Sequence, residues 1–275
     1  MGLFGKLFEK KECSICGGEI GLLGNRKLED GNCCKTCAKK LSPWFDDRRH
    51  STIEQIKAQL AYRAENEKQL ETFKVSRVIG EDYKIYIEEG NGIPTRFFVT
   101  DAKDYMTANP DIVSFKNVLG CTTDIRSREE ELKQRDSNGN MVSYNPPRYK
   151  VHHDFYILMQ IGNTPWFDDM KFKLNGAVIT LEVIGTRSPF GGLFGNSTTT
   201  TGGFGNIRAK ERYHEFEMMC QQVEQAVADS KKAPQAAPVA PAAPAPVVPA
   251  GPKFCSSCGS PADGGKFCQN CGAPL

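Results

Sequence analysis

The clearest hydrophobic pattern in the chain is an alternation of apolar and polar positions over residues 149–161. One face of an extended strand there carries Tyr149, Val151, His153, Phe155, Ile157, Met159 and Ile161. Weaker runs of the same kind occupy residues 75–79, 83–88, 96–100, 112–119, 170–174 and 177–184. Asn-Gly turn dipeptides beginning at residues 91, 138 and 175 separate several of these runs. The pattern predicts about seven short antiparallel strands between residues 74 and 186.

Two other stretches have helical spacing. Ser51-Thr52-Ile53-Glu54 reads as a capping box, and apolar residues follow at helical intervals to about residue 73. The polar middle of this helix, residues 62–69, indicates a solvated connecting rod with one buried stripe, and its charges are expected to form a solvated face. A second helix is predicted from about residue 207 to 229, with one apolar stripe formed by Tyr213, Phe216, Cys220, Val223 and Val227. Strands closed by one amphipathic helix predict a small barrel or rolled sheet, similar in pattern to the pleckstrin-homology-like architecture. That likeness implies no function.

These patterns divide the chain into an α+β protein of several modules. The divisions are an amphipathic segment (1–11), a zinc-binding domain (12–50), a connecting helix (51–73), a central β-rich domain with its closing helix (74–230), a linker (231–252) and a C-terminal zinc ribbon (253–275). Within the central domain, residues 188–206 are rich in Gly and Thr and predict a flexible loop. The linker is almost wholly Ala, Pro and Val, a composition that predicts a disordered but extended and semi-rigid tether.

Cysteine spacing supplies the strongest chemical signal. Eight of the 11 cysteines form four Cys-x-x-Cys pairs, two near the N-terminus and two near the C-terminus. Two such pairs provide the four thiolates that Zn²⁺ accepts in a closed tetrahedral site. We therefore predict two structural zinc ions, with the ligands Cys13, Cys16, Cys34, Cys37, Cys255, Cys258, Cys268 and Cys271. Cys33, beside Cys34, is an alternative ligand. Disulfides or redox chemistry are the other interpretation, but they fit a secreted chain or a single pair better.

Glycine follows three of the four pairs, at Gly17, Gly259 and Gly272. A glycine there can turn with positive φ, so that backbone N–H groups point at the thiolates. Cys37 is followed instead by Ala38. The two C-terminal pairs lie in a repeat, because Lys-Phe-Cys-Ser-Ser-Cys-Gly at residues 253–259 is answered by Lys-Phe-Cys-Gln-Asn-Cys-Gly at 266–272. We expect two near-identical turns that face one ion.

The N-terminal part of the chain, about residues 1–70, resembles an uncharacterised bacterial family of N-terminal zinc-binding domains. The resemblance rests on Cys13-Ser14-Ile15-Cys16-Gly17-Gly18, Cys34-Lys35-Thr36-Cys37, Leu41-Ser42-Pro43-Trp44-Phe45 and Arg48-Arg49-His50-Ser51-Thr52. The C-terminal repeat is similar to a short terminal zinc ribbon found in many bacterial and archaeal proteins. Both resemblances imply zinc ligation by the paired cysteines, and neither implies an activity.

Charge and hydropathy narrow the class of protein. The formal net charge is only +2, and no region of the chain is basic enough to be an obvious surface for nucleic-acid phosphates. No stretch approaches the ~20 apolar residues that span a bilayer, and no signal peptide is recognisable. Thiolate zinc sites suit a reducing compartment, so we expect a cytoplasmic protein. In residues 1–11, an apolar stripe among lysines can rest on an anionic membrane or pack on the ribbon or a partner; its members are Leu3, Phe4, Leu7 and Phe8.

Three further groups of residues are candidate sites. The pentapeptide Pro-Trp-Phe-Asp-Asp occurs at residues 43–47 and 165–169 and is either a docking element or a turn with an aromatic anchor; we expect the latter. His152 and His153 are adjacent on a strand and point to opposite faces, so they cannot share one ion. Cys121 and Cys220 are expected to be buried as small apolar side chains.

No catalytic or cofactor-binding motif is recognisable, so we expect that the protein is not an enzyme. The favoured function is a non-catalytic zinc-binding adaptor or scaffold for unidentified protein partners. Nucleic-acid binding through a ribbon is the alternative. A peripheral membrane role through residues 1–11 is the third.

Overall fold

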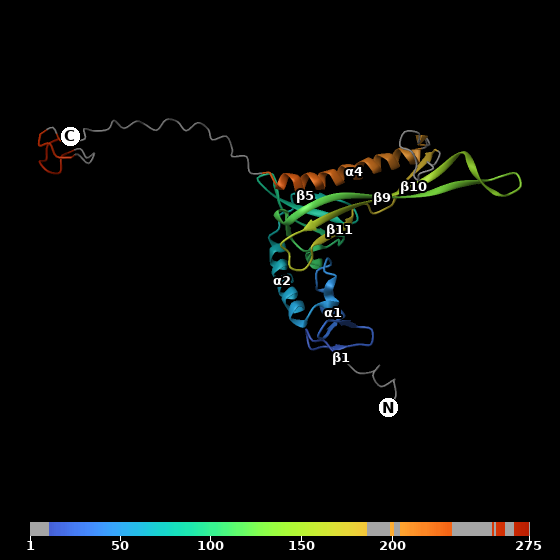
Figure 1. Cartoon of the computed structure of the whole chain (residues 1–275), viewed down its shortest axis with the longest axis horizontal. Helices are drawn as coiled ribbons and strands as arrows, with labels where there is room; N and C mark the ends of the chain where they lie inside the picture. The colour runs from blue at the N-terminus through green and yellow to red at the C-terminus, as the bar shows by residue number, and fades with distance from the viewer. Residues whose placement is uncertain are drawn as a thin grey trace, which may run out of the picture. The chain divides into compact units, whose positions relative to one another are not determined.

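A computed structural model describes residues 11–185, 199–200, 204–232, 255, 257–261 and 267–274 (Figure 1). The chain divides into two compact units, Met1–Lys232 and Ala233–Leu275, and the division falls inside the predicted linker. Three predicted segments lie wholly or largely outside the described residues: the amphipathic segment 1–11, the loop 188–206 and the linker 231–252.

The first module of unit 1, which we call the metal-binding module, consists of two small hairpins and one short α-helix. Its strands are β1 (Lys11–Glu12), β2 (Glu19–Ile20), β3 (Asn25–Lys27) and β4 (Asn32–Cys34), and its helix is α1 (Lys35–Lys39). A 3-10 helix, Asp47–His50, leads into α2 (Ile53–Glu71). One apolar cluster joins the start of α2 to the hairpins; it comprises Cys13, Ile20, Leu28, Cys33, Cys37, Leu41 and Ile56. The metal-binding module therefore has its own small core.

The capping box at the start of α2 lies one residue later than predicted. Thr52 is the N-cap, and its side chain accepts a hydrogen bond from the backbone of Gln55, whose side chain bonds back to Thr52. Ser51 is buried, and its hydroxyl donates to the carbonyl of Asp47. Because Ser51 closes the preceding 3-10 helix, the next hydroxyl takes the capping role.

The central part of unit 1 contains two antiparallel sheets. The first has the order β5-β6-β7-β8, with β5 (Arg77–Ile79), β6 (Lys84–Gly90), β7 (Ile93–Thr100) and β8 (Val113–Ser114). The second contains β9 (Val118–Arg135), β10 (Met141–Ile161), β11 (Asp169–Lys173), β12 (Ile179–Ile184) and β13 (Thr199–Thr200). A short helix, α3 (Tyr105–Ala108), lies between β7 and β8 in the sequence. The predicted antiparallel β-rich domain is confirmed, and its described strands do not close into a barrel.

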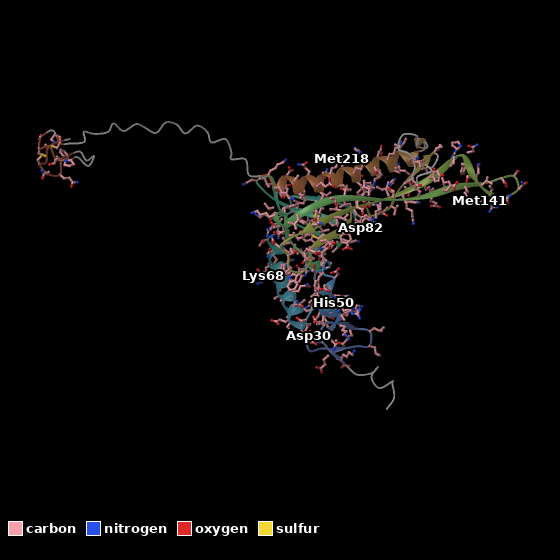
Figure 2. All side chains as sticks on the ribbon, viewed as in Figure 1. Asp30, His50, Lys68, Asp82, Met141 and Met218 are labelled. Atoms are coloured by element: carbon pink, nitrogen blue, oxygen red, sulfur yellow. The ribbon has the colours of Figure 1, made fainter. Side chains whose placement is uncertain are left out.

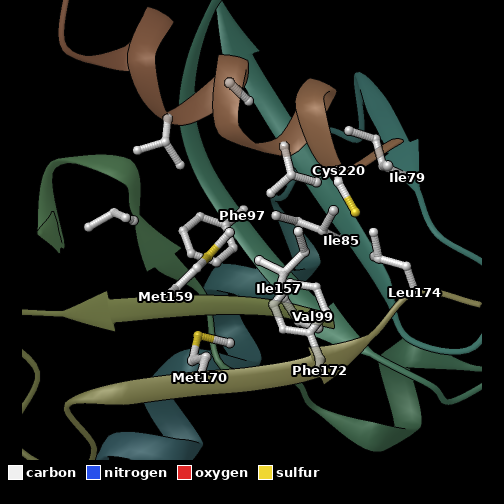
Figure 3. Close-up of a cluster of buried hydrophobic side chains, with 14 of the residues drawn as sticks. Ile79, Ile85, Phe97, Val99, Ile157, Met159, Met170, Phe172, Leu174 and Cys220 are labelled. Atoms are coloured by element: carbon white, nitrogen blue, oxygen red, sulfur yellow. The ribbon is translucent and has the colours of Figure 1, made fainter. Parts of the chain in front are cut away.

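Helix α4 (Phe204–Ser230) covers the core between the sheets (Figure 3). It contacts β5 and β7 of the first sheet and β9, β10 and β12 of the second. Four residues of its predicted apolar stripe are buried: Phe216, Cys220, Val223 and Val227. Ile85, Phe97 and Val99 meet Ile157, Met159 and Phe172 from the second sheet in this core. The predicted closing helix is therefore confirmed.

The sequence pattern missed the length of the β9–β10 hairpin. Strand β9 extends to Arg135, and β10 begins at Met141, before the predicted start at residue 149. The hairpin projects beyond α4 as an arm, and Met141 lies in its outer part (Figures 1 and 2). Side chains on both faces of the outer arm are largely exposed, so the alternation that marks a half-buried strand does not occur there.

The middle of α2 has a solvated face and one buried stripe, as the sequence predicted, but the residues of that stripe are polar. Arg63 and Asn66 are 5% and 2% exposed and contact the segment that precedes β8. The Arg63 guanidinium pairs with Asp111, and the Asn66 amide donates to the carbonyl of Pro110 at 2.8 Å. The Arg63 Nε also donates to the carbonyl of Lys40 at 3.2 Å. Helix α2 thus fastens the metal-binding module to the central sheets.

Candidate metal centres

The structure brings the four N-terminal cysteines into one cluster. Cys13 and Cys16 lie in the turn between β1 and β2, Cys34 ends β4, and Cys37 lies in α1. Their four Sγ atoms lie within 4.8 Å of one another, and Cys16 and Cys34 are separated by 3.9 Å. A tetrahedral ion with metal–sulfur bonds of about 2.3 Å needs sulfurs about 3.8 Å apart. The cluster therefore has the composition and spacing of a four-thiolate metal site.

Backbone geometry explains why three pairs need glycine and one does not. In the first turn, the N–H of Gly17 donates to the carbonyl of Cys13 at 2.8 Å, and Gly17 has φ 71°. An L-residue with a side chain rarely adopts that φ. Cys34 is instead the N-cap of α1, where its Sγ accepts the N–H of Cys37 at 3.3 Å. Ala38 is inside this helix, so no positive φ is required after Cys37.

Cys13 and Cys37 differ in acidity before any ion binds. Burial raises the pKa of Cys13, but N–H donors from Cys16, Cys34 and Ile15 outweigh burial and lower the pKa to about 6. Burial and the neighbouring thiols of Cys16 and Cys34 raise the pKa of Cys37. Cys13 is therefore a thiolate at neutral pH, whereas Cys37 holds a proton that an incoming ion displaces.

Cys33 does not belong to the cluster. Its side chain is fully buried in the small core, and its Sγ donates to the carbonyl of Cys34 at 3.5 Å. Burial and the charges of Cys13 and Cys34 raise its pKa to about 11. Of the two adjacent cysteines, Cys34 is the one that the fold presents to the site, as the two-residue spacing predicts.

The second unit forms a matching cluster from the sequence repeat. The Sγ atoms of Cys255 and Cys271 are 3.6 Å apart, as are those of Cys258 and Cys268, and all four lie within 4.8 Å. Gly259 and Gly272 have φ 70° and 73°. The N–H of each donates to the backbone carbonyl of the first cysteine in its pair, Cys255 or Cys268, at 2.8 Å. The two turns thus repeat the geometry at Gly17. Hydrogen bonds from the Ser260 side chain and backbone lower the pKa of Cys258 to about 6.

The two adjacent histidines make separate polar and ring contacts. The His152 ring contacts the Thr180 hydroxyl at 2.9 Å and Glu130 at 3.3 Å. The His153 ring meets Tyr213 of α4 edge-on, with centroids 4.8 Å apart. The rings therefore have separate neighbours, as strand geometry predicts, and the described residues place neither of them in a metal cluster.

Cys121 and Cys220 contribute to the main apolar core. Burial raises the pKa of Cys121 to about 12 and that of Cys220 to about 11. Both thiols are consequently protonated at neutral pH, when they are poor nucleophiles. Cys220 is buried, as predicted, whereas Cys121 is only partly buried against the core.

The two Pro-Trp-Phe-Asp-Asp segments meet in space, a contact that the sequence did not predict. The rings of Phe45 and Trp166 contact edge-on with centroids 6.3 Å apart. Trp44 packs against Tyr83 and Phe172, whose centroids are 6.2 and 6.4 Å away. Each segment is thus an aromatic anchor, as predicted, and together they join the metal-binding module to the second sheet.

Comparison with known proteins gives one partial match. Among the described residues, no helix is both long and apolar enough to span a membrane. No curated protein and no solved structure matches the chain, so the likeness to the pleckstrin-homology-like architecture stays a prediction. A family described as a domain of unknown function (DUF4428) matches residues 11–59, which include the four N-terminal ligand candidates. The N-terminal module is therefore similar to a domain family without an assigned function, as its sequence resemblance implied.

Proposed function

We propose that the protein is a non-catalytic, cytoplasmic adaptor that binds two structural zinc ions and captures a protein partner through its C-terminal ribbon. Four thiolates are the donor set that Zn²⁺ prefers in closed sites. A closed site leaves no coordination position for water or substrate, so each ion stabilises its module and performs no chemistry.

One observation carries the adaptor proposal: the second cluster lies in a compact unit of its own, Ala233–Leu275. That unit contains the Ala/Pro-rich segment, whose composition is typical of an extended tether. Tethering raises the local concentration of the ribbon near anything that unit 1 binds. A weak contact by the ribbon therefore becomes effective when unit 1 is also engaged.

Affinity capture from native extract tests this function. The full chain is compared with a variant that lacks residues 233–275 and with Cys255→Ser/Cys258→Ser, which keeps the tether and removes two ligands. We expect both variants to lose the same captured protein while unit 1 stays folded. A control, Cys121→Ser, should retain the partner because Cys121 belongs to neither cluster. Identical capture by all four proteins contradicts the adaptor role.

Nucleic-acid binding is the second candidate, and one face of the second sheet favours it. The Arg126 guanidinium and the Lys171 ammonium lie 4.9 and 5.3 Å from the centre of the Tyr156 ring. Cations beside an aromatic ring suit single-stranded nucleic acid, although Asp124 neutralises part of this charge. Filter binding across a salt series tests this candidate, because phosphate contacts weaken steeply with salt. Undetectable binding at low salt would exclude nucleic-acid binding.

A further inference from the structure

One edge of β9 has no partner strand among the described residues. Strand β9 pairs with β10 from Val118 to Arg135, and no other described strand pairs with it. The outer part of this free edge belongs to the arm that projects beyond α4 (Figure 1). A free strand edge presents backbone N–H and C=O groups in the arrangement with which another strand pairs. The arm can therefore accept a further strand beside β9.

The outer part of β9 is regular, although its partner β10 is not. Lys133 lies opposite Ser143, and the preceding residue, Leu132, lies opposite Arg148. Residues 144–147 of β10 thus have no partner in β9, whereas every residue of β9 from Gly120 to Arg135 has one in β10. Bulges and very short strands are devices that prevent pairing at a sheet edge. The free edge of β9 contains neither device between Gly120 and Arg135.

The charges at the outer part of this edge complement themselves. Residues 129–135 read Glu-Glu-Glu-Leu-Lys-Gln-Arg, and their side chains are exposed except for Glu129 and Leu132, which are half-buried. Suppose that two copies pair antiparallel, with Leu132 of one opposite Leu132 of the other. The remaining facing pairs, each present twice, are then Glu131–Lys133, Glu130–Gln134 and Glu129–Arg135. Opposite charges that face each other across antiparallel strands stabilise the pairing.

Other two-fold registers within residues 129–135 place like charges together. A centre at any of the three glutamates puts two glutamates opposite each other, and a centre at Lys133 or Arg135 puts two cations there. A centre at Gln134 makes Lys133 face Arg135 twice. Like charges that face each other destabilise a strand pair. Charged side chains usually protect an edge from pairing, but this set favours one register with a second copy of itself.

We propose that two copies of this chain pair through β9 in the register centred on Leu132, which joins their second sheets into one continuous antiparallel sheet. The free edge, its regular outer part and its self-complementary charges support a second copy as the occupant. This pairing goes beyond the adaptor function. A dimer carries two C-terminal ribbons, so it binds a partner that has two ribbon sites more tightly than one copy does.

Sedimentation velocity of the full zinc-loaded chain over a concentration series tests the pairing. The wild type should dimerise at low salt, and roughly 0.5 M salt should weaken the dimer because it screens exposed charge pairs. Glu131→Lys and Lys133→Glu each turn two favourable pairs of the proposed register into two like-charged pairs. Each variant alone should therefore raise the dissociation constant of the dimer at least about tenfold.

Recombining the two substitutions tests the register itself. In an equimolar mixture of Glu131→Lys and Lys133→Glu, a heterodimer has opposite charges at both of these facing positions. The mixture should therefore dimerise although neither variant does so well alone. The double variant Glu131→Lys/Lys133→Glu exchanges the two charges and should regain dimerisation by itself. General unfolding or a changed net charge does not predict this rescue.

The matched controls are Glu65→Lys and Lys68→Glu, which reverse the same charges in an exposed pair on α2. They should dimerise like the wild type. Glu131→Lys also removes an exposed hydrogen bond from the Ser143 hydroxyl, so zinc content and melting temperature are measured for every variant. The proposal is overturned if the wild type stays monomeric, if the single variants dimerise as well as the wild type, or if their mixture stays monomeric. Because the assay contains only purified protein, its outcome is independent of the capture experiment.

Discussion

The guanidinium of Arg63 lies 2.7 Å from the carboxylate of Asp111, and the two side chains are 6% and 0% exposed. The hydroxyl of Ser42 donates to the same carboxylate, also at 2.7 Å. Arg63 belongs to α2, Ser42 to the metal-binding module, and Asp111 to the segment before β8. One buried charge pair thus connects three parts of unit 1.

Arg63→Ala should destabilise unit 1 by about 3–5 kcal/mol, because it leaves the carboxylate of Asp111 buried without its partner. Burial raises the pKa of Asp111, and Arg63 and Ser42 offset part of that rise. Urea denaturation gives the free energy of unfolding. Lys68→Ala is the matched control, because it breaks an exposed pair with Glu65 on the same helix and should cost less than about 1 kcal/mol. Equal losses in the two variants contradict a role for the buried pair.

The contact between the two pentapeptide segments should appear as an energetic coupling. Phe45→Leu and Trp166→Leu remove an edge-on aromatic contact, so a double-mutant cycle should yield about 0.5–1.5 kcal/mol of coupling in the free energy of unfolding. Phe45→Leu combined with Tyr86→Leu is the control cycle. Tyr86 stacks instead on Phe98 in the first sheet, and this pair should be additive within about 0.5 kcal/mol. Coupling that is equal in both cycles would show that the segments do not anchor each other.

Local patterns predicted the elements that have one buried face. In β10, Phe155, Ile157, Met159 and Ile161 are buried at every second position, which is the alternation read from the sequence. Gly17, Gly259 and Gly272 were predictable for a similar reason, because the turn that follows each of these three Cys-x-x-Cys pairs requires a positive φ locally.

Features that depend on distant partners were not predictable. Arg63 and Asn66 look like solvent-facing residues until Asp111 and Pro110, more than 40 positions away, are placed beside them. The outer part of β9 has no alternation, because its identity as a strand comes from pairing with β10. The meeting of Phe45 with Trp166 likewise depends on the assembled sheets.

Protonation of His153 should lower the stability of the folded protein at acidic pH. Burial lowers the pKa of His153, and the charge of His152 lowers it further. The folded state therefore favours the neutral imidazole, and the contribution of this group is present above the unfolded pKa of about 6.5 and is lost as the pH falls below it. His153→Gln should flatten the decline in melting temperature on the acidic side. His214→Gln, at an exposed position on α4, should keep the wild-type decline. Identical profiles for all three proteins would exclude His153 as a cause.

The two metal sites should load and fail independently, because they lie in separate compact units. Mass-spectrometric metal analysis of the wild type should give two zinc equivalents, and Cys13→Ser/Cys16→Ser and Cys255→Ser/Cys258→Ser should each lose one. Their effects on unit 1 should differ, since Cys13 belongs to a buried core with Ile56 of α2, whereas Cys255 does not. The first variant should therefore lower the melting temperature of unit 1, and the second should leave it unchanged. Cys121→Ser should retain both ions. A wild type with fewer than two equivalents under reducing conditions, or a first variant that keeps both ions, would contradict the assignment of the eight cysteines.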